Sequence, residues 1–74
     1  MERSVYLERM RSALWHKVHG GTREEDIIVY KDVRYYPCGY FLSFDGEEWT
    51  HTAVLHEERC ESVRWVKLSE VGNV

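Results

Sequence analysis

Residues 45–56 read DGEEWTHTAVLH, and this stretch decides the fold because it joins a turn to a strand of regular alternation. Asp45-Gly46 is typical of a two-residue hairpin turn, since such turns need positive φ angles that Asp-Gly adopts at little cost. The residues that follow alternate between two faces of a strand. One face carries Trp49, His51, Ala53 and Leu55, and the other carries Thr50, Thr52, Val54 and His56. The stretch predicts an antiparallel hairpin.

Further extended segments flank this hairpin. Lys31-Asp32 separates two β-branched and aromatic runs and predicts another two-residue turn. Pro37-Cys38-Gly39 interrupts the next run and indicates a turn, a bulge or an edge position, because proline donates no ladder hydrogen bond. The last run changes phase between Trp65 and Val66, which predicts a bulge near Val66 or burial on both faces. The expected strands are residues 27–31, 33–37, 40–45, 47–56 and 62–68.

The segment before the paired glycines Gly20-Gly21 has a helical period instead. Its apolar residues recur at the spacing of one helical stripe: Leu7, Met10, Leu14 and Val18. Ser4 is the expected N-cap, and the glycines supply the backbone freedom at which helices stop. The helix is predicted from about Val5 to His19.

Together these patterns predict one α+β domain over residues 1–74, an N-terminal helix followed by a four- or five-stranded antiparallel meander sheet. Two closures are compatible with the pattern: an open sheet covered by the helix, or a small SH3-like barrel with one long strand bent at Pro37. The open sheet is favoured because an amphipathic helix of this length needs an apolar face to cover.

Composition narrows the class of protein. Ten aromatic residues in 74 supply enough apolar surface for a packed core. No apolar run approaches a membrane span or a targeting signal, and two cysteines fit a reducing compartment, so we expect a soluble cytoplasmic protein. The net charge is −3, and most acidic side chains follow Gly20, which weighs against nucleic-acid binding by the sheet.

No residue pattern indicates catalysis, a cofactor or a metal. His16 and His19 have a spacing that ligates metals, but Cys38 and Cys60 lie in unrelated segments, so no four-ligand zinc set is predicted. We expect both histidines to be solvated near the helix end. His51 shares the apolar strand face and is expected to be a partly buried imidazole bonded to a tyrosine or the backbone.

Two surfaces are candidate binding sites. If the core face holds Val33, Tyr35, Tyr40, Leu42, Phe44, Trp49, Ala53, Leu55, Val63 and Trp65, the opposite face presents Arg34, Tyr36, Phe41, Val54 and Arg64. Aromatic and arginine side chains are common at binding hot spots. The second candidate is an acidic end formed by predicted turns, with Glu24, Glu25, Asp26, Asp45, Glu47 and Glu48. A continuous strand through Pro37 is expected to bring residues 24–26 beside 45–48, and a turn there to bring them beside 57–61.

The leading functional hypothesis is a non-enzymatic protein-binding or regulatory module that uses one of these surfaces, with a basic protein as one class of partner. The alternative is a small nucleic-acid-binding domain. In it the bases stack on Tyr36, Tyr40 and Phe41, and the phosphates meet Lys31, Arg34 and Arg64. Homodimerisation through Trp15 or an edge strand is compatible with either hypothesis.

Overall fold

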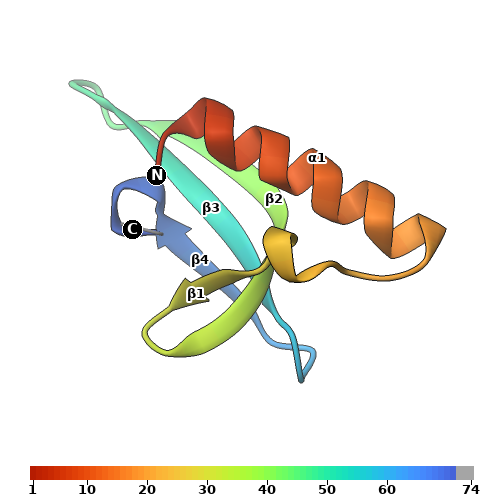
Figure 1. The fold of residues 1–74 in the computed structure, drawn as a ribbon. Coiled ribbons are helices and arrows are strands. Elements are labelled where there is room, and N and C mark those ends of the chain that lie inside the picture. The colour runs from red at the N-terminus through yellow and green to blue at the C-terminus, as the bar shows by residue number, and fades with distance from the viewer. Residues whose placement is uncertain (72–74) are drawn as a thin grey trace.

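The computed structural model describes residues 1–71 and confirms the α+β class. One helix precedes four strands, and two short 3₁₀ helices flank the sheet (Figure 1). The elements in chain order are α1 (Arg3–His19), η1 (Glu24–Asp26), β1 (Ile28–Tyr30), β2 (Val33–Phe44), β3 (Trp49–Glu57), β4 (Val63–Lys67) and η2 (Leu68–Glu70). The strands form one antiparallel sheet in the order β1-β2-β3-β4.

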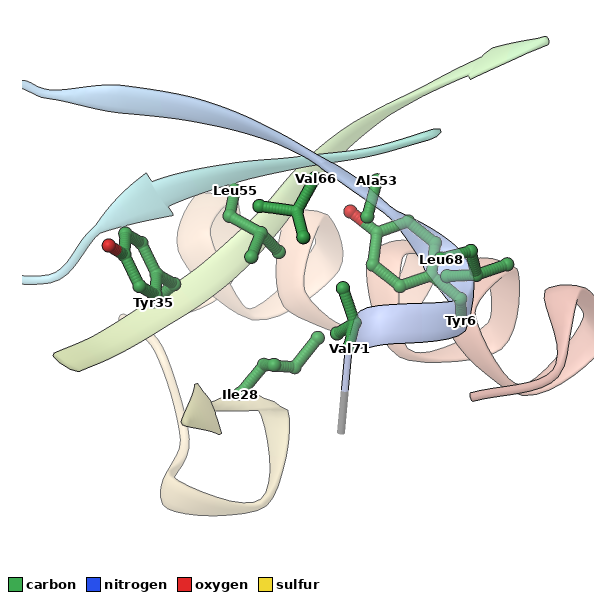
Figure 2. Close-up of a cluster of buried hydrophobic side chains, with 8 residues drawn as sticks. All are labelled: Tyr6, Ile28, Tyr35, Ala53, Leu55, Val66, Leu68 and Val71. Atoms are coloured by element: carbon green, nitrogen blue, oxygen red, sulfur yellow. The ribbon is translucent and has the colours of Figure 1, made fainter. Parts of the chain in front are cut away.

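The sheet curls into a half-barrel, with α1 across its inner face (Figure 1). This arrangement lies between the two predicted closures, because β1 and β4 remain the two edges of the sheet. The buried cluster lies between the helix and the inner face (Figure 2). Its members are Tyr6, Ile28, Tyr35, Ala53, Leu55, Val66, Leu68 and Val71.

β2 is one long strand where two, residues 33–37 and 40–45, were predicted. Cys38 is the extra residue of a bulge, since Pro37 pairs with Leu55 and Gly39 already pairs with Val54. Glu58 N–H donates to the Arg34 carbonyl, so Arg34 and Tyr36 direct their backbone groups toward β3 and Pro37 directs its own away. Pro37 therefore occupies a position that needs no N–H donor toward β3. A Cβ at Gly39 would lie 3.3 Å from the Val54 Cβ, a crowded contact that glycine avoids.

The β1–β2 and β2–β3 hairpin turns differ from each other. Lys31 and Asp32 form the predicted two-residue turn, with φ angles of 50° and 64°. The prediction of a two-residue turn at Asp45-Gly46 was wrong, because β2 ends at Phe44 and β3 begins at Trp49. Asp45 Oδ1 accepts hydrogen bonds from the backbone N–H groups of Glu47 (2.8 Å) and Glu48 (2.9 Å), which stabilises a four-residue loop.

The helix begins at Arg3, so Ser4 lies inside it and the predicted N-cap was wrong; Glu2 occupies that position without a side-chain cap bond. The predicted buried stripe was also wrong, since Leu14 and Val18 are 45% and 78% exposed. Tyr6 and Ala13 are buried instead. The helix is turned about its axis so that Tyr6 reaches the carbonyls of Gly39 and Val54 and His16 reaches Asp26 of η1.

Five aromatic and aliphatic residues predicted for the core are at least 39% exposed: Leu42, Phe44, Trp49, Val63 and Trp65. In β4 the uninterrupted register places Val66 opposite the buried Ala53, so Val63 and Trp65 point outward and the predicted bulge is not present. Leu42, Phe44 and Trp49 have inner-face parity but lie toward the tip of the β2–β3 hairpin.

Candidate binding surface

The outer face of the sheet carries an apolar cluster across three strands. Directly opposed residues share a face, so Val54 of β3 and Trp65 of β4 lie on the same side. Phe41 of β2 and Val63 of β4 have the same parity. Phe41 is 47% exposed and Trp65 is 59% exposed, and their ring centroids lie 5.3 Å apart. We call Phe41, Val54, Val63 and Trp65 the outer-face cluster.

A second aromatic pair continues this face. Tyr36 pairs with His56 across β2 and β3, and the two rings stack with centroids 4.8 Å apart. The Lys17 ammonium group of α1 lies 5.4 Å from the centre of the Tyr36 ring. Such contacts are worth about 0.5–1 kcal/mol at exposed sites. Tyr36 therefore forms part of a polar border beside the outer-face cluster.

The two predicted arginines do not join this cluster. Arg34 Nη1 donates to Glu24 Oε1 (2.7 Å), its Nη2 also binds Glu24, and its Nε donates to Glu58 Oε2 (2.7 Å). These hydrogen bonds raise the pKa of Arg34, and the bond from Arg34 lowers the pKa of Glu24. Arg64 pairs with Leu55 and so lies on the opposite side from Trp65. The positive charges expected beside the aromatics are thus neutralised or displaced.

Sequence reasoning placed Phe41, Val54 and Tyr36 on this face and missed Val63 and Trp65. A strand of five residues with apolar side chains on both faces allows either phase. The signal available in the sequence was that Val66 and Leu68 are two residues apart and so share one face. Leu68 begins the segment that returns to the core. Leu68 opens η2 and is 4% exposed.

The predicted acidic residues occupy two separate regions. Through Arg34, Glu24 is linked to Glu58, so the 24–26 segment lies beside the 57–61 turn although β2 is continuous. The pairing of residues 24–26 with 45–48 was wrong because β1 has only three residues and Ile28 pairs with Tyr35 near the start of β2. Glu25 binds Arg23, whereas Glu47 and Glu48 are exposed.

Asp26 is a buried anchor of the helix. It is 1% exposed, Ser12 Oγ donates to its Oδ1 (2.7 Å), and His16 Nδ1 donates to its Oδ2 (2.7 Å). Burial would by itself raise the pKa of Asp26, but the hydrogen bonds from His16 and Ser12 outweigh burial and lower it. Ser12 also meets the same Nδ1 atom (3.4 Å), so the imidazole does not bridge serine and aspartate as a catalytic triad requires.

The remaining histidines have structural contacts as well. His51 Nδ1 and the Tyr40 hydroxyl share a hydrogen bond, in agreement with the predicted tyrosine partner. His19 Nδ1 donates to the Trp15 carbonyl (2.8 Å), and its ring stacks on the exposed Trp15. His16 is bound to Asp26, so the expectation that it is solvated was wrong.

A shallow groove of about 370 Å³ runs along the inner face between the start of α1 and the end of β4. Arg3, Trp49, His51 and Lys67 contribute to its walls.

Cys38 and Cys60 are free thiols, and burial raises the pKa of Cys38. Among residues 1–71 no group of three or more histidine, cysteine or acidic side chains could hold a metal.

Over the described range of 1–71, no helix has the length and apolar character needed to span a bilayer. Comparison of the chain with protein-family models, with curated proteins and with solved structures found no match.

Proposed function

We propose that this domain is a non-enzymatic protein-binding or regulatory module whose contact surface is the outer-face cluster. The carrying observation is the contact between Phe41 and Trp65, two large rings that are about half exposed on the outer face of three paired strands. Isolated apolar residues are normal on protein surfaces, whereas a contiguous aromatic and aliphatic patch is typical of interaction sites.

The composition of the cluster suits a protein partner. Aromatic anchors surrounded by smaller apolar side chains are the usual content of binding hot spots. Tyr36, His56 and Lys17 supply the polar border that such sites carry. The net charge of −3 favours a partner with a basic rim, and two free thiols support a cytoplasmic location.

The nucleic-acid alternative receives less support from the same geometry. Arg34 is bound by two carboxylates, and Tyr40 and Arg64 lie on the inner-face side of the sheet. Stacking residues and phosphate-binding charges therefore do not gather on one surface. Salt-dependent binding of single-stranded DNA or RNA would reverse this preference.

The test is affinity capture from the source cells, with the wild-type protein compared with Phe41→Ala and Trp65→Ala. Trp49→Ala is the matched control, because Trp49 and Trp65 are both 59% exposed but lie on opposite faces. A partner retained by wild type and Trp49→Ala and lost from both outer-face variants supports the proposal. Equal retention by all four proteins would refute it.

A further inference from the structure

The free edge of β4 has unpaired backbone groups. Glu57 N–H donates to the Ser62 carbonyl, which fixes the alternation of the β3–β4 ladder. It follows that Arg64 and Val66 direct their backbone groups at β3. Val63, Trp65 and Lys67 direct theirs away from the sheet. Within residues 1–71 no strand pairs with this edge, since β4 neighbours β3 alone.

We infer that a second copy of this chain pairs with this edge, antiparallel, about a two-fold axis at Trp65. In this register Trp65 faces Trp65 of the second copy, and Val63 faces Lys67. All three outward-pointing residues then exchange both backbone hydrogen bonds, and two four-stranded sheets become one. An exposed strand edge is a template for such pairing, and side chains at the β4 edge are exposed at 63, 64, 65 and 67.

The length of β4 selects this register over its neighbours, because centring the pair on Trp65 uses the whole strand, Val63–Lys67. The proposed pairing sets Arg64 opposite Val66 of the second copy and places Lys67 diagonal to its Glu61, an attractive pair. A slide of two residues in one direction sets Arg64 opposite Arg64 of the second copy, which is repulsive, and sets Lys67 opposite Glu61, which lies outside β4. The opposite slide requires residues of η2 to act as strand.

The aromatic side chains favour the same arrangement. Trp65 lies at the edge of the outer-face cluster, and its ring is tilted against that of Phe41 with centroids 5.3 Å apart. With Trp65 at the axis, the two clusters form one continuous apolar strip, Phe41–Trp65 followed by Trp65–Phe41 of the second copy. Cross-strand aromatic pairs stabilise sheets in this way. The dimer would present a doubled surface, but its formation does not depend on the proposed function.

The interface is small, since it joins strands of five residues. Interfaces of this size are transient, so we expect a dissociation constant on the order of 0.1 mM. Sedimentation equilibrium over roughly 10 μM to 1 mM should show a rise from the 8.9 kDa monomer toward twice that mass. A monomer throughout this range would overturn the inference.

Two substitutions test the register itself. Trp65→Glu and Trp65→Lys each place like charges in contact at the axis, so each variant alone should be monomeric. An equimolar mixture should associate about five- to tenfold more tightly than either variant, because opposite charges then meet at the axis. Association of the single variants equal to wild type, or no gain on mixing, would overturn the proposed axis.

Amide hydrogen exchange provides a second readout that does not rely on a variant. Rising concentration should slow exchange at Val63, Trp65 and Lys67, while Arg64 and Val66 serve as internal controls because β3 already binds them. Trp49→Glu is the control for general surface charge, and it should dimerise like wild type. Protection confined to Trp15 and its helix would show a different interface and refute the inference.

Discussion

Tyr6→Phe removes one oxygen atom from the contact that fastens the helix to the sheet. Tyr6 is fully buried, and its hydroxyl lies 2.9 Å from the carbonyl oxygens of both Gly39 and Val54 beside the β2 bulge. Loss of the hydroxyl leaves these buried acceptors short of a donor, which costs about 1–3 kcal/mol. A domain of 74 residues has roughly 4–11 kcal/mol of stability in total, so the effect is large.

Urea and thermal unfolding followed by circular dichroism measure this loss, and each kcal/mol should lower Tm by about 4–8 °C. Tyr35→Phe is the matched control, because Tyr35 is 3% exposed but its hydroxyl points away from the buried cluster (Figure 2). We expect the control to change stability by less than about 0.5 kcal/mol. Equal losses in the two variants would refute the assignment of Tyr6 as a hydrogen-bonded anchor.

The same side chain predicts an alkaline dependence. Burial is the main cause that raises the pKa of Tyr6 above its ordinary value. The unfolded chain releases this proton above pH ~10, while the folded chain retains it, so the stability contributed by Tyr6 is lost as pH rises beyond that value. Tyr6→Phe should show a shallower alkaline loss than wild type in the same unfolding series.

Three further changes test other parts of the fold. Asp26→Asn should destabilise the protein above pH ~4, and urea titrations should show that the variant loses less stability than wild type at acid pH. The reason is that the pKa of Asp26 is lowered in the folded protein, so its contribution to stability is present above the pKa of the unfolded chain and is lost as the pH falls below it. Gly39→Ala should cost about 1–3 kcal/mol in urea unfolding through contact of the new Cβ with the Val54 Cβ, and Val54→Ala should not recover this in a double-mutant cycle because alanine keeps the Cβ. Replacement of Lys31-Asp32 by Asn-Gly should raise stability by about 1 kcal/mol in thermal unfolding, since both native residues have positive φ.

Local pattern predicted the elements of this fold better than their packing. The change of apolar period after Gly20-Gly21 and the turn at Lys31-Asp32 depend on nearest neighbours, and both are visible in the sequence. The helix rotation is not, because it depends on Tyr6 reaching a bulge in β2 and on Asp26 binding Ser12 and His16. These contacts join residues that are far apart in the chain.

In the candidate site, too, some positions follow from local pattern and others depend on the folded structure. Phe41 and Val54 follow from simple alternation once Pro37-Cys38-Gly39 is treated as an interruption. Trp65 does not, since a five-residue strand with apolar side chains on both faces has no preferred phase until it pairs with β3. The neutralisation of Arg34 by Glu24 and Glu58 also requires the folded backbone.

Cys38, the extra residue of β2, changes which residues of this strand point outward. Up to Pro37 the even-numbered residues point outward, and after the bulge the odd-numbered ones do. If Cys38 were instead paired in regular alternation, the rest of the strand would be reversed, so Tyr40 would face water and Phe41 the interior. A shift of one residue in the pairing at this position would therefore exchange Phe41 of the outer-face cluster for Tyr40 of the inner face.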